Sequence, residues 1–442
     1  MTTSTATADS TRPNVIVIFC DDLGYGDLGC FGHPTIATPQ LDRMAGEGQK
    51  WTQFYAAAPV CTPSRAALQT GRLPVRRGRC GKDPRVLFPT SKGGLPPDEI
   101  TIGRMLKDRG YATHTVGKWH LGHQKQFLPT NHGYDSYFGI PYSNDMDTAK
   151  DVPPWKEQFA KPRSEYWNVP LMRDEHIVQR PADQTTLTKR YTEETIKLIR
   201  KNREQPFFIY LAHNLPHVPL FTDKQFKDVS RRGLYGDVIE EIDWSVGEIL
   251  KTLKELKLDE KTFVVFTSDN GPWLSKGKNG GSAKPLRDGK FSTYEGGMRV
   301  PCVMRWPGQV PAGKVCAEVA CTLDVLPTFA KLAGAKLPAD RVIDGKDIWP
   351  LASGQDGAKS PRPAFCFFRG NNLQAVRGGQ WKLHFARKGA ALAPKALYDL
   401  SADIGEQTDV LKDHPDVAAK LLEQAEEIRA NINENKRPVG QL

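Results

Sequence analysis

The fold is decided by the stretch VIVIFCDD, residues 15–22, in which a continuous apolar run leads directly into two carboxylates. A run of this kind, rich in β-branched side chains, predicts a strand buried on both faces, as in the parallel sheets of α/β proteins. The two aspartates indicate where that strand ends.

The same apolar pattern recurs along the chain at residues 112–116, 207–211 and 263–267. Stretches with helical periodicity lie between these runs, for example at residues 191–200 and 238–256. Strands that alternate with helices predict an α/β fold with a large, mostly parallel sheet sandwiched by helices.

Each predicted strand runs into polar side chains at its C-terminal end. These side chains are Asp21 and Asp22, Lys118 and His120, His213 and His217, and Asp269 and Asn270. Ligands of open α/β sheets bind outside the carboxyl ends of the strands, so the four segments predict one shared site.

The composition changes after about residue 350, where Ser, Gly, Pro and Lys dominate residues 352–363 and indicate a linker. Short strand-like runs and a helical stretch at 415–431 follow, which predict a small antiparallel sheet with one helix. We therefore expect a disordered N-terminus over 1–12, a large catalytic domain over 13–350 and a C-terminal subdomain over 351–442.

The overall composition is that of a folded globular protein, with 25% charged and 39% hydrophobic residues. The net charge of +10 favours anionic partners, but the basic residues are scattered and form no nucleic-acid-binding motif. No apolar run approaches the roughly 18 residues of a membrane helix. We expect neither a nucleic-acid nor a membrane partner.

The N-terminal sequence MTTSTATADSTRPN lacks the apolar core of a secretory signal. If the protein is bacterial, we expect the native form to be periplasmic or secreted with its leader removed; a cytoplasmic location is the alternative.

Asp21, Asp22, Asp269 and Asn270 offer hard oxygen ligands, which suit Ca²⁺ or Mg²⁺ better than zinc. Either pair alone is more typical of a turn that ends a strand. None of the eight cysteines forms a CxxC pair, which weighs against a structural zinc site.

Cys61 precedes a short helical pattern that ends at Gly71, with Pro63 in the first turn. The expected helix N-terminus attracts anions through its free N–H groups. A thiol there could be a reactive cysteine of lowered pKa, although a buried structural cysteine is the commoner role.

CTPSR at 61–65 and AALQTGR at 66–72 resemble the CxPxR motif, with its downstream TGR, of the type I sulfatases. Companion segments also resemble that family: GKWHLG at 117–122, PHVP at 216–219, SDNG at 268–271, GK at 289–290 and EGGMR at 295–299. Residues 138–145, 32–34 and 235–237 look most like the arylsulfatase A and N-acetylgalactosamine-6-sulfatase branch.

The resemblance implies an alkaline-phosphatase-like fold and a calcium-dependent sulfuric ester hydrolase, with Mg²⁺ a poorer candidate. It implies that a maturation enzyme oxidises Cys61 to formylglycine (3-oxoalanine), whose hydrate attacks sulfur. The implied metal ligands are Asp21, Asp22, Cys61, Asp269 and Asn270.

The resemblance also implies roles around the sulfate group, whose negative charge must be neutralised before attack. Arg65, Lys118 and Lys290 supply positive charge, and Asp269 helps to deprotonate the attacking hydroxyl. His217 acts with Lys290 on the leaving oxygen, while His120 removes the second diol proton so that sulfate is expelled.

A sulfated carbohydrate is the expected substrate, and candidates for the sugar pocket are Arg79, Tyr142, Asn144, Asp145, Trp273 and Arg369. Ordinary surface roles remain open for each of them. Trp119 and the remaining histidines near these motifs are more typical of packing. Two other functions remain open: a phosphonate or phosphate ester hydrolase of the same superfamily, and a sulfated-glycan binding protein without turnover.

Overall fold

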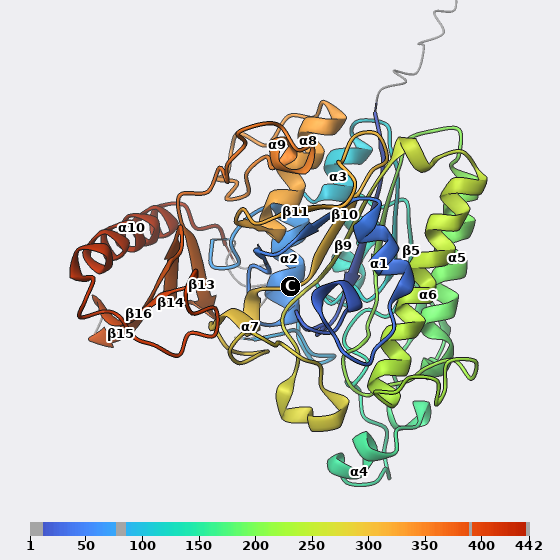
Figure 1. Cartoon of the computed structure of the whole chain (residues 1–442). Helices are drawn as coiled ribbons and strands as arrows, with labels where there is room; N and C mark the ends of the chain where they lie inside the picture. Colours follow the sequence, from blue (N-terminus) through green and yellow to red (C-terminus); the bar gives the residue numbers. More distant parts are fainter. Residues whose placement is uncertain (1–11, 77–84, 389–390, 439–442) are drawn as a thin grey trace, which may run out of the picture.

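A computed structural model describes residues 12–76, 85–388 and 391–438. A ten-stranded sheet runs through the centre of the molecule (Figure 1), in the order β11-β2-β10-β9-β1-β8-β4-β5-β6-β7. Its strands are β1 Asn14–Cys20, β2 Gln49–Trp51, β4 Ala112–Gly117, β5 Ser136–Gly139, β6 Leu171–Arg173, β7 His176–Gln179, β8 Phe207–Ala212, β9 Thr262–Ser268, β10 Cys302–Arg305 and β11 Lys314–Cys316.

The middle of this sheet is parallel. β1 pairs with β8 on one side and with β9 on the other, and β4 joins β8 to β5, all in the parallel sense. Every residue of β1, β8 and β9 is buried, which explains why these strands read as continuous apolar runs. β10, β6 and β7 are antiparallel to their neighbours, so the sheet is mixed.

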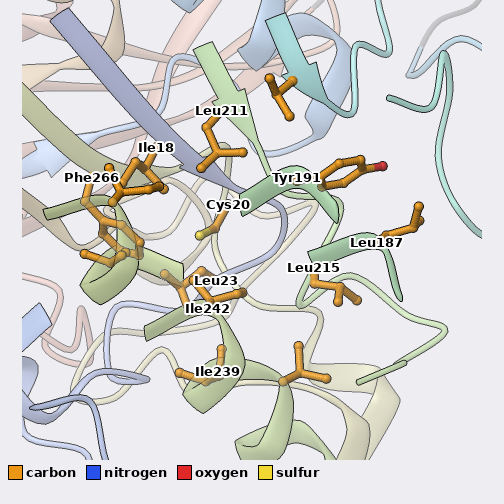
Figure 2. Close-up of a cluster of buried hydrophobic side chains, with 14 of the residues drawn as sticks. Ile18, Cys20, Leu23, Leu187, Tyr191, Leu211, Leu215, Ile239, Ile242 and Phe266 are labelled. Carbon is orange, nitrogen blue, oxygen red and sulfur yellow. The ribbon is translucent and has the colours of Figure 1, made fainter. Parts of the chain in front are cut away.

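Helices cover both faces, because the side chains of each central strand alternate between two cores. Val15, Val17 and Phe19 belong to one core, on the side of α2 (Cys61–Thr70), α3 (Ile102–Lys107) and α8 (Val325–Ala333). Ile16, Ile18 and Cys20 face the other core, on the side of α1 (Pro39–Gly46), α5 (Leu187–Lys201) and α6 (Leu234–Glu255). Figure 2 shows part of the second core, with Ile239 and Ile242 of α6 below β1.

A four-stranded antiparallel sheet follows in the C-terminal part, and one helix packs on it (Figure 1, left). Its elements are β13 Phe365–Arg369, β14 Asn372–Gly378, β15 Trp381–Lys388, β16 Ala391–Asp399 and α10 Pro415–Glu434. The core of this sheet also contains Tyr55, Leu73 and Cys321 from the large domain, so the two parts share one interior. Tyr55 and Cys321 lie on the short strands β3 (Phe54–Tyr55) and β12 (Ala320–Cys321).

The predicted fold class is confirmed in both parts. The predicted helix at 191–200 is a longer element, α5, and residues 353–364 form neither helix nor strand, as expected of a linker. Of the N-terminal segment predicted to be disordered, residues 1–11 lie outside the described residues, and the division into domains stays a prediction. Among the described helices, none is both long and apolar enough to cross a bilayer.

Candidate active site

The predicted site residues converge at the carboxyl ends of β1, β4, β8 and β9, where the N-terminus of α2 also lies. Ligand atoms of Asp21, Cys61 and Asp269 lie within 4.8 Å of one another, as do those of Asp21, Asp22 and His217. All five side chains are buried. Parallel strands bring their carboxyl ends to the same edge, so the prediction of one shared site agrees with the geometry.

Asp21 and Asp269 are joined by the guanidinium of Arg65. Its Nη2 lies 3.0 Å from Asp21 Oδ2, and its Nε donates to Asp269 Oδ2 at 3.0 Å. Lys118 donates to Asp21 as well and reaches Ser143 Oγ at 2.9 Å. Burial alone would raise the pKa of Asp21, but Lys118 and Arg65 outweigh it and hold that pKa far below its usual range.

Asp22 forms the second half of the site. Lys290 Nζ lies 2.7 Å from Asp22 Oδ1, which also accepts a hydrogen bond from Asn270 Nδ2 at 2.7 Å. His217 Nε2 lies 3.7 Å from Asp22 Oδ2. Burial lowers the pKa of Lys290, but the adjacent carboxylate outweighs it, so the pKa lies above its usual range and Lys290 stays charged.

The backbone at this edge is strained. Asp22 and His120 both have left-handed backbones, with φ of 66° and 58°, which non-glycine residues rarely adopt. Gly117 has a φ of 101°, and a Cβ there would lie 1.9 Å from the carbonyl oxygen of Ala212. Only glycine therefore lets the chain turn at the end of β4 and direct Lys118 and His120 to the site.

Cys61 is the first residue of α2, and its side chain is 3% exposed. Burial raises the pKa of its thiol to about 12, although Lys118 opposes the shift. The alternative of a reactive cysteine with a lowered pKa therefore finds no support, because a thiol in this setting stays protonated at neutral pH.

The residues at the strand ends fit a hard divalent cation. Among the described atoms, Asp21 Oδ1 and Asn270 Oδ1 are buried without a hydrogen-bond partner, so both can accept a cation. Burial raises the pKa of Asp22 to about 6 and that of Asp269 to about 7, as expected of carboxylates that crowd around an anionic neighbour. A bound cation would relieve this repulsion.

His120 and His217 are both buried, and burial holds both pKa values well below the usual range, so the rings are neutral. Nε2 of His120 lies 2.8 Å from the carbonyl oxygen of Leu87, which can only accept, so Nδ1 carries the lone pair. His217 has the opposite tautomer, because Nδ1 lies 2.5 Å from the carbonyl oxygen of Val218. Among the described atoms, His120 Nδ1 has no partner and can accept a proton.

Only some of the described candidates for the sugar pocket line a cavity. Trp273 and Arg369 line one cavity of about 540 Å³, together with Lys290. Asp145 lies close enough to Lys118 for that charge to act on its carboxyl group. Tyr142 donates to Asp147 at 3.1 Å, and Asn144 is fully buried, donating to Gln184 and to Pro219.

The side chains of Tyr142 and Asn144 thus bind other parts of the protein, and Arg79 lies outside the described residues. Two polar residues of the site were not predicted. Ser143 accepts from Lys118, and Lys276 lies 4.3 Å from the ring of Trp273. Ser143 stands inside the segment that resembles the family, but a lone serine gives no sign of its lysine partner.

Comparisons with known proteins agree with this geometry. The sulfatase family model matches residues 13–335, and a model described as N-sulphoglucosamine sulphohydrolase, C-terminal, matches residues 287–431. The chain belongs to the sulfatase family. It is 41% identical to human arylsulfatase A, over 90% of this chain and 83% of that protein.

It is also 42% identical to N-acetylgalactosamine-6-sulfatase of the dog, over 84% of this chain and 72% of that protein. A crystal structure of Ps i-CgsB in complex with k-i-k-neocarrahexaose superimposes with a TM-score of 0.81 at 33% identity, covering 94% of this chain and 92% of that one. The protein is thus a sulfuric ester hydrolase with the expected alkaline-phosphatase-like fold, and its family implies the metal site that the acidic cluster can form.

Proposed function

We propose that this protein hydrolyses sulfate monoesters of a carbohydrate, using a formylglycine derived from Cys61 and a bound Ca²⁺ ion. The observation that carries the proposal is the position of Cys61, whose Sγ at the start of α2 lies within 4.8 Å of carboxylate oxygens of Asp21 and Asp269. Relatives named for sulfated sugars support the substrate class.

Asp21, Asp22, Asp269 and Asn270 would hold the ion, and the atom at position 61 would complete the set. These oxygen donors favour Ca²⁺, which accepts irregular sets of carboxylate and amide ligands, over Mg²⁺, which demands regular octahedral geometry. When bound, the ion supplies positive charge beside the sulfate oxygens, and the hydrated aldehyde supplies a nucleophilic oxygen.

The cationic side chains neutralise the substrate before attack. Arg65, Lys118 and Lys290 balance the three carboxylates of the site, so a divalent ion leaves the site with a net positive charge that attracts the sulfate group. Lys290 keeps its proton and can donate a hydrogen bond to the leaving oxygen. Asp269, with a pKa raised to about 7 by burial, can take a proton from the attacking hydroxyl.

The two histidines have different capacities. Nδ1 of His120 carries a lone pair and has no partner within the described part of the chain, which suits a base that removes the remaining diol proton. His217 has its lone pair on Nε2, so it can give a proton to the leaving oxygen only after it has accepted one.

The maturation enzyme must act before the chain folds. Cys61 is 3% exposed and Arg65 is fully buried in the folded protein, so these two residues of the pentapeptide are out of reach there. We therefore propose that oxidation takes place on the unfolded chain.

Mass spectrometry of the peptide that contains residue 61, together with its reaction with a hydrazide, tests for the aldehyde. Assays with 4-nitrophenyl sulfate, the matching phosphate and a phosphonate ester then test the reaction. We expect an aldehyde and a preference for the sulfate. An unmodified thiol with no turnover would support the glycan-binding alternative, and a preference for the phosphonate would support the other hydrolase.

A further inference from the structure

The cavity beside Lys290 is built from both parts of the chain. One wall comes from the large domain, at residues 273–275 and 288–294. The other wall comes from the C-terminal sheet, which contributes Arg369 of β13, Gln374 of β14, His384 and Phe385 of β15 and Lys395 of β16. Its volume of about 540 Å³ lies in the range of small-molecule sites.

The cavity carries an excess of positive charge. Lys290 is already paired with Asp22, but Arg369 and Lys395 are exposed and form no ion pair with any described residue. Asp288 is the only carboxylate among the described lining residues, and it accepts a hydrogen bond from Ser292 at 3.0 Å. Two cations are therefore free for an anionic ligand.

The two walls are held at a fixed distance. Thr293 Oγ1 donates to Gln374 Oε1 at 2.9 Å, and the ring of Tyr294 stacks on His384 with centroids 4.6 Å apart. Next to them, the backbone N–H of Glu295 donates to Glu406 at 2.6 Å. A ligand that bridges the walls therefore meets a site that is already formed, which lowers the entropic cost of binding.

Trp273 gives the cavity an aromatic surface next to the reacting group. The ammonium of Lys290 lies 4.6 Å from its ring centroid, and Lys276 lies 4.3 Å from it. The ring thus lies beside two cations at the point where the cavity meets the candidate active site. Aromatic side chains with a few polar groups are typical of sites for small organic ligands.

We propose that this cavity is a second anion subsite, in which Arg369 and Lys395 bind a sulfate or carboxylate on the sugar next to the one that carries the scissile sulfate. The substrate is then a saccharide with at least two anionic groups. This inference rests on the proposed function, because Lys290 borders both the cavity and the acidic cluster.

The test measures inhibition of 4-nitrophenyl sulfate hydrolysis by two galactose disaccharides. One carries a single sulfate, and the other carries a sulfate on each sugar. A disaccharide that is not cleaved gives an inhibition constant equal to its Kd, and one that is cleaved gives its KM, so each compound is compared between the unaltered enzyme and the variant. For the unaltered enzyme we expect the disulfated compound to bind about tenfold more tightly, as two charge-assisted contacts allow.

The double variant Arg369→Gln, Lys395→Gln should lose most of this preference, and added salt should reduce it in the unaltered enzyme. A matched variant, Lys412→Gln with Lys420→Gln, removes two exposed lysines outside the cavity lining and should keep it.

Equal inhibition by both compounds, or a preference that survives in the cavity variant, would overturn the second subsite. Absence of 4-nitrophenyl sulfate hydrolysis by enzyme with a converted Cys61 would overturn the proposed function instead, so the two failures can be told apart.

Discussion

Two buried groups of charged residues lie within one chain, and they differ in how completely their polar atoms are paired. The strand-end cluster comprises Asp21, Asp22, Arg65, Lys118, Asp269, Asn270 and Lys290. The junction cluster, between the large domain and the C-terminal sheet, comprises Tyr55, Glu295, Arg299, Arg377, Lys382, His384 and Glu406.

The junction cluster is saturated. Glu295 accepts a hydrogen bond from Lys382 on Oε1 at 2.9 Å and one from Tyr55 on Oε2 at 2.5 Å. No described side-chain atom of this cluster is buried without a hydrogen-bond partner. The strand-end cluster leaves Asp21 Oδ1 and Asn270 Oδ1 unpaired. The two unpaired oxygens can accept a ligand, whereas the described side chains of the junction cluster leave no buried acceptor of this kind.

The pKa shifts show the same contrast. Burial would raise the pKa of Glu295, but Lys382 and Arg299 outweigh it and lower that pKa to about 2. At the strand ends, burial raises the pKa of Asp22 to about 6 and that of Asp269 to about 7. The neighbouring cations thus outweigh burial at Glu295, and at Asp21 of the site, but not at Asp22 and Asp269.

The largest expected effect is that of Cys61→Ala, which should reduce 4-nitrophenyl sulfate hydrolysis at least about 10⁴-fold, because the nucleophile is gone. Stability should change little, because Cys61 Sγ makes no hydrogen bond within the described part of the chain and alanine favours the helix. Enzyme kinetics and thermal denaturation measure the two effects. Retained turnover would contradict the proposed nucleophile.

Glu295→Ala, in contrast to Cys61→Ala, should strongly lower the free energy of unfolding. It removes the carboxylate that Lys382 and Arg299 share, at a cost of roughly 3–5 kcal/mol, because buried cations lose their partner. Urea denaturation measures the free energy of unfolding. Glu426→Ala, which breaks a partly exposed pair with Arg429, is the control and should cost roughly 0–1 kcal/mol. Equal losses in the two variants would show that the junction is not a structural cluster.

The stability of the junction should also depend on pH. The folded pKa of Glu295 is lowered to about 2 from a usual 4.5, so its contribution is complete above pH 4.5 and is lost as pH falls towards 2. The shift corresponds to roughly 3 kcal/mol. Urea denaturation at pH 6 and pH 3 should show that the advantage of the unaltered protein over Glu295→Gln shrinks. A constant difference across this range would exclude the charge of Glu295 as the cause.

Much of the large domain could be predicted from the sequence, because its central strands are buried on both faces and therefore read as continuous apolar runs. The short strands β2, β10 and β11 could not, since three or four residues carry little periodicity. The polar residues after β1 and β9 were predictable as one site, because parallel strands end at the same edge.

Contacts between distant segments could not be predicted. Lys382 meets Glu295 across 87 residues of chain, and nothing in either local sequence indicates the pair. Arg369 and Trp273 were named as separate candidates, but only the packing of the C-terminal sheet brings them to one cavity. Asn144 and Tyr142 were also named for the sugar pocket, and nothing in the sequence indicates that Asn144 binds Gln184 or that Tyr142 binds Asp147.

Loss of the unpaired oxygen of Asn270 should reduce hydrolysis less than loss of the nucleophile. Asn270→Ala removes Oδ1 and the hydrogen bond to Asp22, so hydrolysis should fall about a hundredfold as the affinity for the cation falls. Addition of Ca²⁺ to metal-free protein should raise the melting temperature of the unaltered chain, since a ligand at 100 times its Kd adds about 2.7 kcal/mol.

The variant Asn270→Ala should lose most of this response to Ca²⁺, whereas the junction variant Tyr55→Phe should keep it despite a lower starting stability. Thermal denaturation at several Ca²⁺ concentrations gives both results. If Asn270→Ala responded to Ca²⁺ as the unaltered protein does, the unpaired oxygen would not be a cation ligand. The unpaired oxygens of the strand-end cluster would then give it no ligand-binding role that the junction cluster lacks.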